Sequence, residues 1–192
     1  MLLVKRKDVQ VRPTTKSDRA VKSAVEDAVA AEGIVPTRRQ DLNKQGIALL
    51  DEIMAYRNES VIERYMTDNS ASRQEAEIAY VGLLQFLVLS VFNKGNHTPS
   101  KIIDEMWHCF ILHMRDYEEF CKKYLRQVVY HDPAHDDNAF KYYSVARNCV
   151  IELFGEADEQ AWPLEHTRYL RCISCPPVLA FLFGDCMLVQ AA

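Results

Sequence analysis

The amino-acid sequence predicts an all-α fold, a compact multi-helix domain with an irregular N-terminal lead-in and a less regular C-terminal segment. Through most of the chain, apolar residues recur at spacings of three and four, the period of a helix that buries one face. Serine, proline and glycine stand at positions where helices begin and end. With 48% hydrophobic and 26% charged residues, the composition is that of a globular protein. These three observations indicate helices packed around one core.

The length predicts a single domain. At 192 residues the chain is long enough to bury a hydrophobic core without division into separate units. Residues 1–16 lack a helical period and contain Pro13, which predicts an irregular lead-in. The helical domain is expected to span residues 17–192. Its first helix begins at Ser17 and ends at Gly33, because glycine tolerates the left-handed geometry of a helix end.

Three further helices are predicted before the middle of the chain. One lies within residues 42–56, and another begins after Asn58. Ser72 and Glu75 have the spacing of a capping box, in which each side chain bonds a free backbone amide of the other. This box predicts a helix over about residues 73–92, and its apolar composition places it at the centre of the fold.

The next helix carries the residues of most functional interest. Thr98 is its predicted N-cap and Pro99 its first helical residue, where the missing amide of proline carries no penalty. Asp116 belongs to a second capping signal, which predicts another helix over residues 117–126. The two helices are therefore expected to meet near Arg115.

The last predicted helix covers residues 140–154 and is ended by Gly155. Beyond it, Trp162-Pro163 and the prolines at 176 and 177 interrupt any helical pattern, because the residue before a proline is pushed out of helical geometry. The C-terminal segment is therefore expected to be less regular.

Charge and hydropathy exclude two classes of partner. The formal net charge is −4, and acidic and basic residues are interspersed, so no cationic face for nucleic acid is predicted. The longest apolar run, residues 81–92, is interrupted by Gly82, Gln85 and Ser90, which predicts a buried helix rather than a membrane span. The N-terminus has no secretory pattern. A cytoplasmic protein with a protein or small-molecule partner is expected.

Asp104 and His108 form the first part of a candidate site. They lie four residues apart on one helix, so their side chains share a face. A carboxylate beside an imidazole fixes its tautomer, which supports both metal-binding and catalytic histidines. Ile103, Trp107 and the apolar residues that follow form the adjoining stripe, which predicts scaffold. The alternative is a partly buried histidine that the carboxylate merely satisfies.

Cys121 and His131 lie downstream, and a reversal of the chain would bring them back to His108. A set of His108, Cys121 and His131 suits zinc or iron, with zinc favoured, because both accept imidazole and thiolate. Asp104 would then be a weaker fourth ligand or would orient His108. The expected protein is thus a helical domain that binds a transition metal.

Two other functions remain open. In the first, the protein is an enzyme that uses Asp104 and His108 as an acid–base pair and Cys121 as nucleophile or as ligand of an open metal site. In the second, it is a non-catalytic interaction module in which Trp107 and Tyr117 lock two helices together. The sequence holds no glycine-rich phosphate loop, G-x-S-x-G elbow or H-E-x-x-H motif.

The remaining cysteines divide into two groups. Cys172 and Cys175 have the two-residue spacing of a zinc or redox pair and are weaker candidate metal ligands. Cys109, Cys149 and Cys186 lie among apolar neighbours, where a free cysteine acts as a small buried hydrophobe.

A set of motif residues is shared with a known family: Leu84-Gln85-Phe86-Leu87, Pro99-Ser100, Asp104, Trp107-His108, Ile111-Leu112, Tyr117, Phe120-Cys121 and His131-Asp132-Pro133. Over about residues 49–133 the chain resembles the glycine-rich domain-containing protein-like family, whose biochemistry is largely uncharacterised. The resemblance implies a shared helical scaffold with a site centred on Trp107 and His108. Two features depart from it, since residues 122–130 contain no glycine and the glycine-rich extension is missing.

Overall fold

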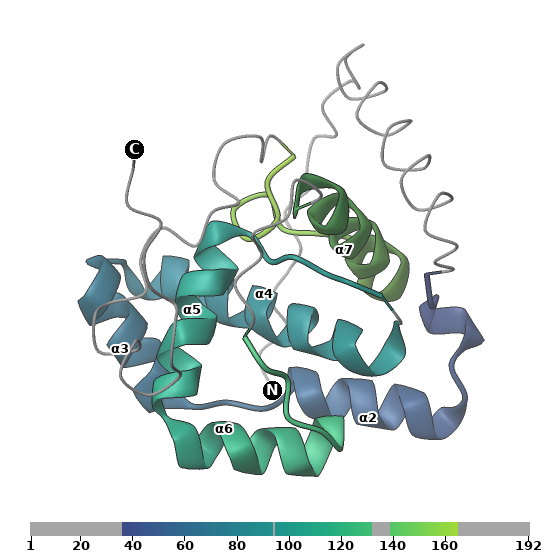
Figure 1. The fold of residues 1–192 in the computed structure, drawn as a ribbon, viewed down its shortest axis with the longest axis horizontal. Coiled ribbons are helices and arrows are strands. Elements are labelled where there is room, and N and C mark those ends of the chain that lie inside the picture. Colours follow the sequence, from purple (N-terminus) through teal and green to yellow (C-terminus); the bar gives the residue numbers. More distant parts are fainter. Residues whose placement is uncertain (1–35, 94, 132–138, 165–192) are drawn as a thin grey trace, which may run out of the picture.

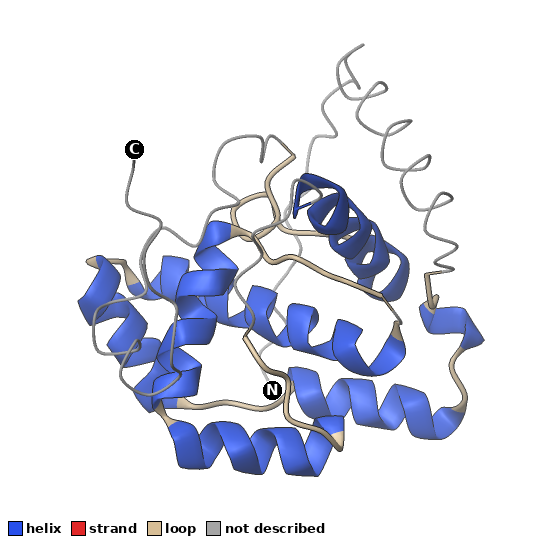
Figure 2. Ribbon diagram, in the orientation of Figure 1, coloured by secondary structure: helices blue, strands red, loops and turns tan. Residues whose placement is uncertain are grey.

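A computed structural model describes residues 36–93, 95–131 and 139–164. Within these ranges the chain forms helices and connecting loops and contains no strand, which confirms the all-α prediction (Figures 1 and 2). The predicted lead-in, the helix from Ser17 to Gly33, and the pair Cys172 and Cys175 lie outside the described residues. The elements are η1 (Arg39–Asp41), α2 (Lys44–Met54), α3 (Glu59–Asn69), α4 (Arg73–Phe92), α5 (Lys101–Leu112), α6 (Met114–Phe120), the π-helical turn η2 (Cys121–Leu125) and α7 (Ala139–Phe154).

Helix α4 is the central element of the described fold. It contacts α2, α3, α5, α7 and η2, which surround it in Figure 1. The predicted capping box is present: Ser72 Oγ accepts from the Glu75 amide at 3.3 Å, and the Glu75 carboxylate accepts from the Ser72 amide at 2.8 Å. Ten of its residues are buried, on nearly every side of the helix. A helix that is apolar on nearly every side is buried, either in a protein core or in a membrane.

The apolar composition of α4 also has to be compared with that of a membrane-spanning helix. Among the residues that the structure describes, α4 is the one helix long and apolar enough to cross a bilayer. Buried core helices pass this test too, and 61% of its most apolar window is buried inside the structure. The helix is therefore weak evidence for a membrane span.

Gly82 lets α4 and α5 approach closely. A Cβ at this position would lie 2.9 Å from Ala161 Cβ and 3.0 Å from Ile103 Cγ1. Both distances are shorter than van der Waals contact, so only glycine fits without a shift of α5 or of the segment after α7. The glycine that interrupts the apolar run in the sequence thus serves helix packing.

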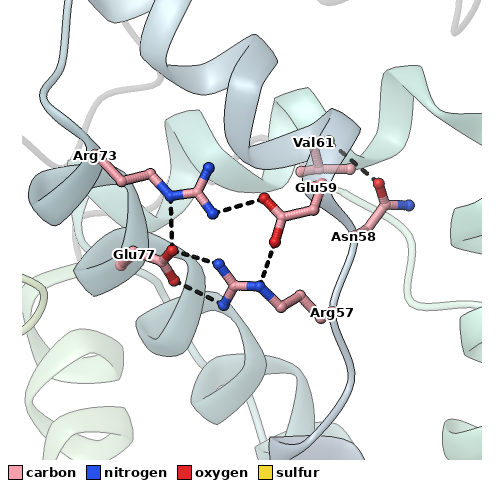
Figure 3. A network of polar contacts seen from close by, with 6 residues as sticks. All are labelled: Arg57, Asn58, Glu59, Val61, Arg73 and Glu77. Carbon is pink, nitrogen blue, oxygen red and sulfur yellow. Dashed lines mark hydrogen bonds and ion pairs between the residues drawn. The ribbon is translucent and has the colours of Figure 1, made fainter.

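A network of four charged side chains joins the start of α3 to the start of α4 (Figure 3). Arg57 is bonded to Glu59 and Glu77, and Arg73 is bonded to the same two carboxylates at 2.6 and 2.8 Å. Asn58 caps α3 beside this network, since its Oδ1 accepts from the Val61 amide at 3.2 Å. Because these side chains are well exposed to solvent, the network orients the two helix ends more than it stabilises the fold.

A cluster of aromatic rings packs α5, α6 and η2 together. The Phe120 ring lies 4.8 Å from Tyr56, 5.4 Å from Phe110 and 5.2 Å from Tyr124, measured between centroids. Phe110, Phe120 and Tyr124 are buried. The cluster fixes the turn after α6, which leads to the candidate site.

Two predicted helix boundaries are wrong. Helix α5 begins at Lys101, not Pro99, because Ser100 is the N-cap and its Oγ accepts from the Ile103 amide at 3.3 Å. The break before α6 falls at His113 rather than Arg115, and α6 has no side-chain cap. Asp116 lies inside the first turn of α6 rather than at its cap, and its carboxylate accepts a hydrogen bond from Asn58 Nδ2 at 2.7 Å.

Beyond α6 the chain widens into the π-helical turn η2, and Arg126 follows it in the left-handed region at φ 61°. The predicted final helix is confirmed as α7, and Gly155 follows it at φ 88°. Trp162 is fully buried, and its indole donates to Gln85 Oε1 on α4 at 2.9 Å. The segment after α7 is thereby fastened to the central helix.

Candidate metal centre

Helix α5 places Asp104 and His108 on one face, one turn apart. The Ser100 cap fixes the start of the helix, and the i, i+4 spacing sets the two side chains side by side. His108 Nδ1 lies 3.8 Å from Asp104 Oδ2. The His108 side chain is 9% exposed and that of Asp104 is 20% exposed, so the pair lies at the edge of the core.

His131 reaches the same place from a distant part of the sequence. Its Nε2 lies 2.6 Å from Asp104 Oδ1, a hydrogen bond across 27 residues of chain. The imidazole rings of His131 and His108 are 4.5 Å apart between centroids. One donor atom from each of Asp104, His108 and His131 lies within 4.8 Å of the other two. A carboxylate oxygen and two imidazole nitrogens therefore converge.

The environment favours the neutral form of His108. Burial lowers the pKa of His108, the nearby His131 lowers it further, and the Asp104 carboxylate opposes both effects. A metal binds the unprotonated nitrogen of an imidazole. At neutral pH the histidine is therefore in the form that a ligand requires.

Trp107 forms one wall of the cluster. Its ring lies 4.6 Å from the His131 ring and 5.2 Å from Phe86 of α4, between centroids. Its indole Nε1 donates to Tyr117 Oη at 3.1 Å, and that hydroxyl donates in turn to the carbonyl of Val129. Trp107 is scaffold, as the sequence predicts, but it also packs directly against one histidine of the cluster.

Cys121 does not belong to the group that the structure brings together. Its side chain is fully buried, and burial raises the pKa of the thiol, an effect that hydrogen bonds with the Val129 backbone and Tyr117 partly offset. An activated cysteine needs the opposite, a lowered pKa and access to solvent. The described geometry thus sets Asp104 beside the two histidines, in the place where the sequence analysis expected a thiolate.

The other cysteines follow the expectation where the structure describes them. Cys109 and Cys149 are buried free thiols, and burial raises the pKa of Cys109 to about 12 and that of Cys149 to about 11. Cys172, Cys175 and Cys186 lie outside the described residues. The thiols of α5 and α7 are therefore core side chains.

Comparison with known proteins gives a match to a family of uncharacterised proteins. Residues 50–141 match the family described as UCP032817-like, over just under half of the chain. The chain is similar to this family over that range. No curated protein and no solved structure matches the chain.

This match corrects the family resemblance drawn from the motif residues. The UCP032817-like family is uncharacterised, and no glycine-rich domain-containing family is found. The chain has six glycines in all and none between Lys122 and Tyr130, so it lacks the feature that names the glycine-rich family. The matched range nevertheless contains Asp104, His108 and His131.

The three donors define what the cluster can do chemically. Two imidazoles and one carboxylate suit zinc, and the same set with open positions is also a ligand set of iron(II). None of the three side chains is fully enclosed, since Asp104 is 20% and His131 14% exposed. The arrangement can therefore hold a divalent metal with one side open to solvent.

Proposed function

We propose that this protein binds a divalent transition metal, with zinc favoured, through Asp104, His108 and His131. The observation that carries the proposal is the convergence of three donor atoms within 4.8 Å of one another. Two come from adjacent turns of α5 and one from the segment after η2, so the site depends on the folded chain. The ligand set contains Asp104 in place of Cys121.

The geometry is close to that of an occupied site. Zinc bonds to nitrogen and oxygen donors are about 2.0–2.2 Å long, which sets the donors roughly 3.3–3.6 Å apart in tetrahedral geometry. Here one donor pair is closer, Asp104 Oδ1 and His131 Nε2 at 2.6 Å, and another is longer, His108 Nδ1 and Asp104 Oδ2 at 3.8 Å. Because the two distances involve different oxygens of Asp104, its carboxylate has to rotate for one oxygen to bond the metal beside both nitrogens.

Three protein ligands leave one position of a tetrahedral metal for another molecule. Structural zinc sites are commonly closed by four protein ligands, whereas sites with three keep a position for water or substrate. The partial exposure of Asp104 and His131 favours the open type. We therefore propose a small molecule as the partner of the metal, in a cytoplasmic protein whose thiols stay reduced.

A zinc titration tests the proposal. The sample is the full chain without an affinity tag. It carries Cys172→Ser and Cys175→Ser so that these two thiols cannot bind the metal. A chelator first removes any metal already bound. Calorimetry should then show about one equivalent of zinc bound per chain, as a single site with three protein ligands requires. A protein that binds no zinc, iron(II) or cobalt(II) under these conditions contradicts the proposal.

Two variants locate the metal on the chain. His108→Ala in this background should abolish the high-affinity zinc site, because it removes one of three ligands. His113→Ala is the matched control, a histidine of the same helix region whose Nδ1 lies 2.9 Å from the Cys109 carbonyl. Circular dichroism confirms that both variants fold. Equal zinc affinity in the two variants would place the metal elsewhere.

A further inference from the structure

We propose that Tyr117 is a positioning residue that holds His131 against Asp104 and Trp107. The inference rests on the proposed function for its meaning, since it explains how the third ligand reaches the site. The observation behind it is the Tyr117 hydroxyl, which accepts from Trp107 Nε1 at 3.1 Å and donates to the Val129 carbonyl.

The Tyr117 hydroxyl links helix α5 to the loop that follows η2. Trp107 lies on α5 and Tyr117 on α6, whereas Val129 lies in the loop after η2. Val129 stands two residues before His131, a reach of about 7 Å for extended chain. Fixing the Val129 carbonyl therefore restricts the volume in which the His131 side chain can lie.

His131 in turn contacts two residues of α5, Trp107 and Asp104. Its ring packs 4.6 Å from Trp107 and its Nε2 lies 2.6 Å from Asp104 Oδ1. Trp107 is thus held by Tyr117 on its indole nitrogen and contacts His131 with its ring. The Tyr117 hydroxyl therefore positions both the Trp107 ring and the backbone that carries His131.

The ring and the hydroxyl of Tyr117 have separable roles. The ring is buried and packs edge-on against Phe110 at 5.2 Å between centroids, which fastens α6 to α5. Tyr117→Phe keeps this ring and removes only the hydroxyl. Any change it causes at His131 therefore reports the polar contacts of the hydroxyl, with Trp107, Val129 and Cys121, rather than the aromatic core.

Tyr143 supplies a matched control. It is also a buried tyrosine, and its hydroxyl donates to a loop carbonyl, that of Pro163, at 2.8 Å. It belongs to α7, and its ring stacks on Trp162. Tyr143→Phe thus removes a comparable hydrogen bond at a place unrelated to the metal ligands.

The first measurement is made on metal-free protein. The ring protons of His131, assigned by comparison with His131→Gln, should show the upfield shift that the Trp107 indole causes at 4.6 Å. This shift should collapse in Tyr117→Phe and persist in Tyr143→Phe. An unchanged shift in Tyr117→Phe overturns the inference, whether or not the protein binds metal.

The second measurement is zinc affinity in the background without Cys172 and Cys175. Removal of a group that orients a ligand lowers metal affinity by about 10-fold or more, and Tyr117→Phe should do so. Tyr143→Phe should leave the affinity unchanged. Equal losses in both variants, or none in Tyr117→Phe, contradict the role. A wild-type chain that binds no zinc contradicts the proposed function alone, because the metal-free shift still decides the position of His131.

Discussion

Asp104 is the residue on which the candidate site depends most. One carboxylate oxygen faces His131 at 2.6 Å and the other faces His108 at 3.8 Å. The helical spacing predicts the second contact, because Asp104 and His108 are four residues apart. It does not predict the first, because a partner 27 residues away is fixed by tertiary structure. The sequence therefore indicates the pair and not the group of three.

His97 gives the clearest pH dependence among the described residues. Burial lowers the pKa of His97 to about 4 from an ordinary value of 6.5, and its Nε2 has no hydrogen-bond partner. The unfolded chain therefore binds the proton more readily between pH 6.5 and 4. The stability associated with neutral His97 is fully present above pH 6.5 and is lost as the pH falls through this window.

We expect His97→Gln to remove this part of the pH dependence. In the presence of chelator, wild-type protein should lose about 2 kcal/mol more unfolding free energy than the variant between pH 7 and pH 4. Urea unfolding at a series of pH values measures the difference. The carboxylates and the other histidines titrate alike in both proteins, so their effects cancel. Parallel curves for the two proteins would show that His97 is not buried in its neutral form.

At the scale of the elements, capping and periodicity predict most helices well. The box at Ser72 and Glu75 gives the start of α4 correctly, because its signal is local and both partners are present. Thr98 is a poorer guide, since Ser100 offers a hydroxyl closer to the first free amides of α5. The break at His113 carries no proline or glycine. It could not be predicted from local propensity.

The turn η2 explains why Cys121 lies apart from the group of Asp104, His108 and His131. A helix that continued regularly after α6 would present Cys121 on a periodic face. The π-helical turn from Cys121 to Leu125 buries the thiol and changes the direction of the chain toward His131. Such turns have no strong sequence signature. Sequence reasoning grouped Cys121 with the two histidines, whereas the structure brings Asp104, His108 and His131 together.

The variant Gly82→Ala tests how closely α4 and α5 pack. The new methyl group would lie 2.9 Å from Ala161 Cβ, which cannot rotate away. Overpacking of this kind costs about 1–3 kcal/mol, more than the gain of up to about 1 kcal/mol that alanine brings to a helix. We expect a lower unfolding free energy, measured by urea denaturation.

Gly46→Ala is the matched control for this prediction. Gly46 is also helical, but a Cβ there would meet no atom closer than 3.5 Å. The Asn43 cap bonds its amide, which alanine retains. This variant should be unchanged or more stable. A Gly82→Ala protein as stable as Gly46→Ala would mean that α4 and α5 pack less closely than described.

At the scale of the molecule, one apolar helix organises the core and leaves the site at its edge. Helix α4 contacts the elements around it, and α5, packed against it at Gly82, carries Asp104, Trp107 and His108. Amphipathic patterns of the surrounding helices predict this all-α architecture. They carry no information on which loop returns to α5. That return, from η2 through Val129 to His131, is what creates the convergence.

X-ray absorption at the zinc edge tests the proposed ligand set most directly. The sample is the full chain with Cys172→Ser and Cys175→Ser, loaded with one equivalent of zinc or less. The account predicts a first shell of nitrogen and oxygen only, at about 2.0–2.2 Å, with the outer scattering of two imidazole rings. A sulfur atom at about 2.3 Å would contradict it, because it would place a thiolate such as Cys121 on the metal instead of Asp104.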